Sequence, residues 1–207
     1  MRGSANVRSA SRRALTLDPR HPLSFALGER EYRRSEQSWV EAGEPRAAVT
    51  IAVEGVQLAI GIDVHAGPVV IIADDAVNEM DNEYPDTNAA GVQLSLLDAR
   101  GQLHRWLIRP SRDGSPRIRP LTRDALSIDV STLVHATSWS ARIALPLGAA
   151  ADASPYSIAL GVSINEIPPE RERRLGQLVL GGAEGEWVYL RGDRDDPSKF
   201  IPIVIHR

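Results

Sequence analysis

Length and composition exclude several classes of protein before any motif is considered. The chain has 207 residues, of which 43% are hydrophobic and 25% are charged, with 24 basic against 27 acidic side chains. Such a chain can bury one sizeable core, so we expect a folded domain that is not disordered and does not bind nucleic acid through bulk charge. The absence of cysteine excludes disulfide bonds, thiolate nucleophiles and cysteine-ligated metal sites.

The segment 1–22 is expected to form a flexible basic arm. It contains five arginines against the acidic residue Asp18, and no apolar run of the length that a signal peptide needs follows it. Since no stretch approaches about 18 consecutive apolar residues, we expect no membrane span and no membrane partner. Residues 23–207 are then predicted to form a single domain.

From about Leu23 onward, apolar residues recur with a period of two, which is typical of β-strands. The clearest example is Ala47–Val64, where two alternating apolar runs flank the dipeptide Glu54-Gly55 and predict a β-hairpin. Further strands are expected at residues 68–72, 92–97, 103–108, 126–130, 139–145, 156–164, 175–180, 187–190 and 200–205.

The number and length of these strands favour one fold class. Roughly ten or more short strands, separated by turn clusters, predict an all-β protein with an antiparallel β-sandwich of jelly-roll-like form. At most one short helix is expected, near Gly148–Ala153. The absence of an internal repeat excludes propellers and solenoids.

Alternation also predicts which side of a strand faces the core. In the segment Trp139–Leu145 the apolar residues share one face with Trp139, so we expect this indole in the inter-sheet core. The segment Leu103–Arg109 is ambiguous because each face carries both apolar and polar side chains, with Arg109 on one and Trp106 on the other. Either assignment exposes groups that a ligand can contact.

Four short motifs follow one another in a fixed order along the chain. The first is VQLAIGIDV at 56–64, which leads to Asp74-Asp75, and the others are DTNAAGVQLSLLD at 86–98, SWSARIALP at 138–146 and YSIALGVSINE at 156–166. In this order they resemble the sugar-binding sandwiches of carbohydrate-binding module family 9 and the wider group of DOMON-like domains. The resemblance spans residues 47–166, and a closing strand is expected near Trp187.

This resemblance implies a non-catalytic carbohydrate-binding module. Members of the family hold the ends of sugar chains between two tryptophan rings, because aromatic rings stack on the apolar face of a sugar while its hydroxyls need donors and acceptors. Asn165 occupies the position of the family's strand-end asparagine, but Ile167-Pro168-Pro169 stands where an aromatic residue is expected. The ligand-binding residues that we expect are Trp106, Trp187, Asn165, Arg109, Glu83 and Tyr84.

Related DOMON-like domains bind haem or sugars. No pair of methionine or histidine residues in the pattern resembles axial haem ligation, so no haem is expected. The resemblance favours an extracellular or periplasmic location, although no signal peptide is visible and the compartment stays unassigned.

An acidic segment occupies residues 66–99. It contains seven Asp or Glu side chains and no Lys or Arg, so its charge needs neutralising. Structural calcium, which the family resemblance also implies, would do this with carboxylate and carbonyl oxygens. The alternative is a solvated acidic loop without a metal. The candidate calcium ligands are Asp74, Asp75, Asp81 and Asp86.

The arginines downstream of this segment form two groups. Those near the C-terminal end alternate with acidic residues, which favours surface ion pairs over a nucleic-acid patch. Those around a proline-rich turn are less neutralised and can grip an acidic sugar or a carboxylate, although surface solubility is the commoner role. This second group consists of Arg105, Arg109, Arg112, Arg117 and Arg119.

Known catalytic motifs are absent from the sequence. It has no G-x-S-x-G, H-E-x-x-H, Walker or G-x-G-x-x-G signature, so we expect no enzyme, while a pair of carboxylates for glycoside hydrolysis stays open. The alternative function is a structural or protein-interaction sandwich that docks a partner protein or a catalytic domain. Exposed rings of Trp106 and Trp187 beside a groove favour a sugar ligand, and buried rings favour the interaction module.

Overall fold

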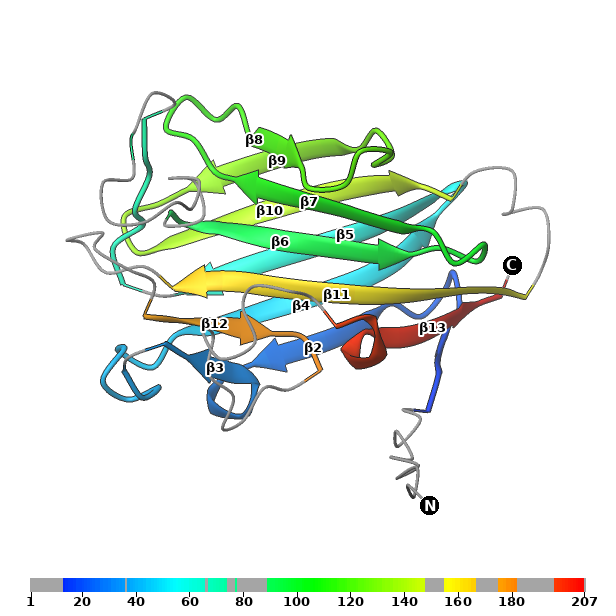
Figure 1. Ribbon diagram of the computed structural model, residues 1–207, viewed down its shortest axis with the longest axis horizontal. Coiled ribbons are helices and arrows are strands. Elements are labelled where there is room, and N and C mark those ends of the chain that lie inside the picture. The colour runs from blue at the N-terminus through cyan, green and yellow to red at the C-terminus, as the bar shows by residue number, and fades with distance from the viewer. Residues whose placement is uncertain are drawn as a thin grey trace, which may run out of the picture.

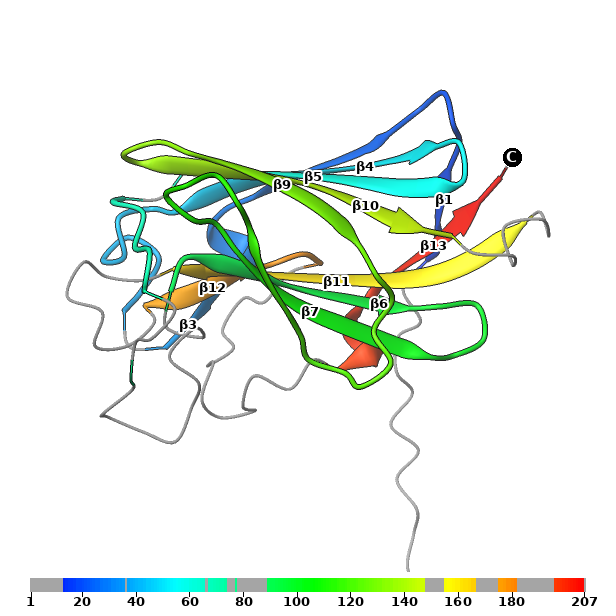
Figure 2. The ribbon, with the colours of Figure 1, turned by 90° about the horizontal axis from the view of Figure 1, so that it is seen from above.

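The computed structural model of the 207-residue chain describes residues 13–35, 37–65, 67–73, 77, 89–147, 155–166, 175–181 and 196–206. Within these ranges thirteen strands form two sheets, stacked face to face as two layers (Figures 1 and 2). The prediction of an all-β sandwich is confirmed. No helix in the described ranges is long and apolar enough to cross a membrane.

The smaller sheet contains five antiparallel strands and is built around the predicted hairpin. In spatial order it consists of β2 (Leu23–Leu27), β4 (Arg46–Glu54), β5 (Gln57–His65), β10 (Ser138–Pro146) and β9 (Asp129–Val134).

The larger sheet has a main path of six strands and a two-strand branch. The main path runs β1 (Leu15–Leu17), β13 (Ile201–Ile205), β11 (Tyr156–Glu166), β6 (Gly91–Leu97), β7 (Leu103–Arg109) and β8 (Arg117–Pro120). The branch begins on β11, where β12 (Gly176–Val179) pairs with its C-terminal half, and β3 (Tyr32–Arg34) then pairs with β12. Two short 3-10 helices complete the described elements, η1 (Glu29–Glu31) and η4 (Pro197–Lys199).

The β4–β5 hairpin shows how the alternating pattern becomes structure. Ile51 pairs with Ile60, and both side chains point into the inter-sheet core. Gly55 supplies the positive φ of +60° that the tight turn requires. The turn therefore consists of Gly55 and Val56, and Val56, expected in the strand, is 66% exposed instead.

The core lies between the two sheets and is lined by the inward side of every long strand. Trp139 is buried there, as predicted, and Trp106 faces it from the opposite sheet. This resolves the ambiguous strand β7: its His104 and Trp106 face inward, and Arg109 lies on the outer face.

Strand β1 lies inside the segment 1–22 that was expected to be a flexible arm. It pairs in parallel with β13, with Leu15 opposite Ile203 and Leu17 opposite Ile205. Leu17 is fully buried in the core. The fold therefore begins by Leu15, ahead of the boundary expected at residue 23.

Two strand predictions were wrong. Residues 68–72 do not form a strand, because Val69 N donates to Ala136 O beside the smaller sheet while Val70 O accepts from Ala90 N beside the larger one, so the segment crosses between layers. The strand predicted at 126–130 lies instead at Asp129–Val134. The predicted helix at 148–153 and strand at 187–190 lie outside the described residues.

Candidate functional site

The outer face of the larger sheet carries buried polar side chains, which is unusual because side chains on that side do not face the other layer. These residues come from adjacent strands and share the outward register of Asn165. Buried polar groups are normally held by hydrogen bonds, so we expect this row to be an ordered, hydrogen-bonded layer and not a solvated surface. Its members are Arg33, Gln93, Ser95, Ser163, Asn165 and Gln177.

A chain of hydrogen bonds runs through the middle of this row. The guanidinium of Arg33 donates to Gln177 Oε1, and Gln177 Nε2 donates to Asn165 Oδ1 at 2.9 Å. Asn165 Nδ2 in turn donates to Ala89 O at 3.4 Å. Gln177 is 0% exposed and Asn165 3% exposed, so both amides are fixed in one orientation by their neighbours.

Asn165 and Arg109, predicted to serve one site, lie on the same outer face on either side of β6. Gly91 is the cross-strand partner of Asn165 and separates the two. A Cβ on Gly91 would lie 2.9 Å from Ile108 O and 3.2 Å from Arg109 Cγ. The stem of Arg109 therefore packs over the backbone of Gly91, toward the side of Asn165.

Beyond Arg109 lies a cavity of about 480 Å³ at the ends of β7 and β8. Arg109 and Arg117 are directly opposite each other on these strands and both line the cavity. Arg117 Nη2 lies 3.6 Å from Asp113 Oδ2. Hydrogen bonds from the Ser111 hydroxyl and the Ser115 amide lower the pKa of the Asp113 carboxyl. The full lining is Ile71, Ile72, Ala73, Arg109, Pro110, Ser111, Arg112, Asp113 and Arg117.

Trp106, predicted to stack on a ligand, does not reach this surface. Its ring is 2% exposed in the inter-sheet core, and its Nε1 donates to Leu126 O at 3.0 Å. The ring also stacks on His104, with 6.2 Å between ring centroids. The prediction that Trp106 contacts a ligand is therefore corrected: this indole packs the sandwich.

The remaining predicted site residues lie outside the part of the chain that the structure describes. Among the described residues, no group of three or more His, Asp or Glu side chains is placed to hold a metal ion. The candidate ligand residues concerned are Glu83, Tyr84 and Trp187, and the candidate calcium ligands are Asp74, Asp75, Asp81 and Asp86.

Sequence reasoning missed every member of the polar row except Asn165, including the two residues that build the hydrogen-bonded chain with it. Gln177 interrupts the apolar run LGQLVL, and a lone amide inside a buried strand is a usable signal because it needs a partner. Arg33 gave no such signal, since it stands among charged residues in the stretch EREYRR.

The fold is similar to two solved structures of a carbohydrate-binding module family 9 from Caldicellulosiruptor kristjanssonii. The complex with cellotriose has a TM-score of 0.64 and 12% identity, with 94% of this chain and 94% of that chain covered. The complex with glucose has a TM-score of 0.65 and 12% identity, with 93% and 95% covered. No protein-family model matches the chain, and no curated protein matches it. The chain therefore has the β-sandwich fold of carbohydrate-binding module family 9.

Proposed function

We propose that the protein is a non-catalytic carbohydrate-binding module whose ligand lies on the outer face of the larger sheet. The observation that carries the proposal is the hydrogen-bonded chain from Arg33 through Gln177 to Asn165, beside Arg109. The buried amides of this chain fix the shape of the outer face, and the half-buried guanidinium of Arg109 beside them presents donors to sugar hydroxyls at little entropic cost. The similarity in fold to two sugar-bound structures supports the same reading.

In this mechanism Arg109 donates to the hydroxyls of the sugar, and the buried amide of Asn165 supports the surface on which the sugar lies. Trp187 and Tyr84 form the aromatic platform on which the sugar stacks, because Trp106 is buried in the core. Glu83 supplies a further acceptor, and calcium bound by the acidic segment 66–99 stabilises the neighbouring loop. These roles of the platform, the carboxylate and the metal rest on the sequence.

Calorimetric titration with neutral and acidic oligosaccharides, each with and without calcium, tests the proposal. We expect saturable binding that Arg109→Ala weakens about tenfold or more, because a hydrogen bond from a charged group contributes roughly 1.5–3 kcal/mol. Arg46→Ala, which removes an exposed arginine on the outer face of the smaller sheet, is the matched control and should leave binding unchanged. The absence of a binding heat with every sugar, both with and without calcium, would refute the proposal.

A second candidate function is a protein-interaction module, and the burial of Trp106 favours it. An edge strand such as β9, which pairs only with β10 among the described strands, offers backbone groups to a partner. The same titrations separate the two candidates, because an interaction module without a sugar site gives no heat with any oligosaccharide.

A further inference from the structure

The outer face of the smaller sheet is built from unusually small side chains. Across β4, β5 and β10, the outward positions of one row are Ala52, Ala59 and Ala144. The next row contains Gly61, over which the side chain of Arg142 lies. Small residues leave a flat surface that another flat surface can approach closely, and no described element covers it.

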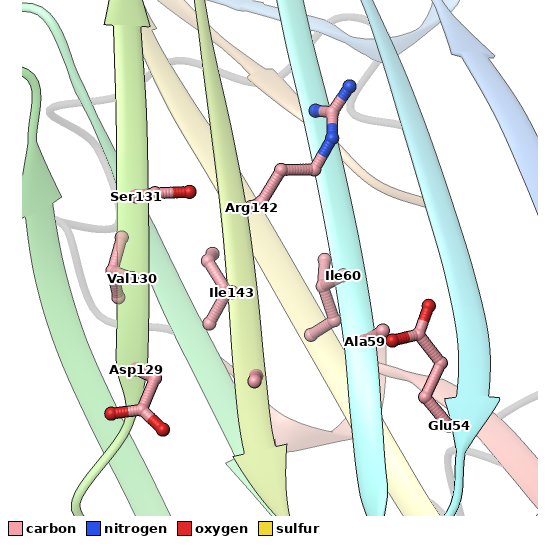
Figure 3. A pocket seen from close by; sticks show the side chains of 9 residues that line it. Glu54, Ala59, Ile60, Asp129, Val130, Ser131, Arg142 and Ile143 are labelled. Carbon is pink, nitrogen blue, oxygen red and sulfur yellow. The ribbon is translucent and has the colours of Figure 1, made fainter.

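A hollow of about 480 Å³ opens on this face (Figure 3). Its floor is formed by Ala59 and Ala144, with Asp129 on one side, Glu54 on the other and Arg142 along the rim. All of these residues lie on strands of the smaller sheet or at their ends, so the hollow has a rigid base.

The two carboxylates of the hollow have no ion pair or hydrogen bond to their side chains in the structure described, and both residues are exposed. Arg142 is different: its Nη2 lies 3.1 Å from Asp63 Oδ1, in a pair whose side chains are 58% and 40% exposed. Nη1 of Arg142 donates to Ala141 O at 3.1 Å and to Ile62 O at 3.4 Å. Since exposed ion pairs contribute little, Nε and Nη2 can donate to a second carboxylate. The hollow is thus acidic and its rim is basic.

We propose that this face is the interface of a symmetric dimer of the chain, in which Arg142 of each copy enters the hollow of the other. The two-fold axis lies in the plane of the interface and is perpendicular to the strands. The strands of one copy therefore run antiparallel to the strands of the other. Arg142 reaches across Gly61 toward Asp63, so in the second copy its guanidinium comes to lie over the alanine floor between the two carboxylates. An isologous interface requires such reciprocity.

The charges at the ends of the face fit the same arrangement. Glu54 stands at the end of the face next to the hairpin turn, and Arg46 at the opposite end of the same strand. Under this two-fold axis the Glu54 end of one copy meets the Arg46 end of the other. Leu133, an apolar side chain that is 58% exposed, lies on the same outer face and would be covered.

The size of the face is of the order that a dimer needs. Three strands of nine residues, with β2 of five and β9 of six, give roughly 600 Å² at about 4.8 Å between strands and about 3.3 Å per residue. Specific interfaces bury about 800 Å² on each partner. The proposal concerns the sheet opposite the sugar site, so it is independent of the proposed function.

Sedimentation velocity of the full chain over a range of protein concentrations tests the proposal. We expect a dimer that weakens as salt is raised, because its central contacts are ionic. Arg142→Asp and Asp129→Arg should each weaken self-association at least about 30-fold. An equimolar mixture of the two variants should dimerise again, since each copy then supplies what the other lacks.

Three controls accompany these variants. Asp63→Asn reports the loss of the ion pair within one copy, and Arg30→Asp and Glu29→Arg make the same charge changes on the exposed helix η1. Should Arg142→Asp fail to fold, Arg142→Ala removes the same contact. A wild-type chain that stays monomeric at about 100 μM, single variants that dimerise like wild type, or a mixture that stays monomeric would each overturn the proposal. A monomer would leave the hollow to a small cationic ligand.

Discussion

Asp98 and His104 form a pair at the turn between β6 and β7 that the sequence did not single out. Asp98 Oδ1 accepts from the amides of Arg100 and Gln102 at 2.9 and 2.8 Å, and Asp98 Oδ2 lies 3.3 Å from His104 Nε2. The other ring nitrogen lies 3.1 Å from Asp124 O. Burial raises the pKa of Asp98, but the hydrogen bonds and the histidine outweigh it, and the net pKa is lowered.

This lowered pKa predicts a contribution to stability that depends on pH. The contribution is fully present above the unfolded-state pKa of about 3.9 and is lost as the pH falls through the lower folded-state value. Asp98→Asn keeps an acceptor for the two amides but no charge, so the gap in unfolding free energy between wild type and variant should shrink as the pH is lowered below about 4. Denaturant unfolding at several pH values measures it. A gap that is constant in pH would contradict the assignment.

A second prediction at this scale concerns Gln177, whose amide joins Arg33 to Asn165. Gln177→Leu leaves both neighbours short of a partner in a buried position, so we expect a loss of about 2–3 kcal/mol in unfolding free energy. Gln102→Leu is the control, because the side chain of Gln102 is exposed. Chemical denaturation compares the two variants, and equal losses would mean that the buried chain of hydrogen bonds is dispensable.

At the scale of elements, every strand of seven or more residues was predicted, as were the apolar short strands β12 and β13, whereas the short strands β1, β2, β3 and β8 were not. Strands β5 and β10 alternate inward apolar residues with outward polar or small residues over nine positions, and this pattern predicts both strands and their inward faces. Strand β8 has the sequence RIRP, with Ile118 exposed and no apolar face, and it exists only because β7 offers it an edge. Tertiary pairing of this kind leaves no periodic signal.

Strand β3 depends on β12 in the same way, and Gly176 makes the contact possible. A Cβ on Gly176 would lie 2.6 Å from Arg33 O and would also meet the ring of Tyr32. We therefore expect Gly176→Ala to separate β3 from the sheet and to cost about 1–3 kcal/mol. Hydrogen exchange of the β3 amides measures the separation. Gly67→Ala is the control, since its Cβ would meet nothing within 4 Å, and unchanged exchange in Gly176→Ala would refute this role.

At the scale of the whole molecule, the sequence predicted the sandwich but not the pairing of its first strand with its last. Alternation is a local property, whereas the parallel pairing of β1 with β13 joins segments from the two ends of the chain. The same holds for the site. Asn165 could be identified by its motif, but the face on which Arg109 lies, and its separation from Asn165 by Gly91, depend on the order β11-β6-β7. Spatial order is what the sequence alone does not contain.

The role of β1 is testable through Leu17, which is fully buried in the core. Leu17→Ala should lower the unfolding free energy by about 3 kcal/mol through the cavity it leaves. Thr16→Ala, at an exposed position of the same strand, should change it by less than about 0.5 kcal/mol. Thermal unfolding of both variants checks this. If Leu17→Ala were as stable as Thr16→Ala, the segment before residue 23 would not belong to the core.

The parallel pair also determines how the domain would bear mechanical force. Tension applied through the chain ends pulls the start of β1 and the end of β13 in opposite directions along their common axis, so their hydrogen bonds are loaded together in shear and not opened one after another. The three paired residues at this edge would then act as the mechanical clamp of the sandwich.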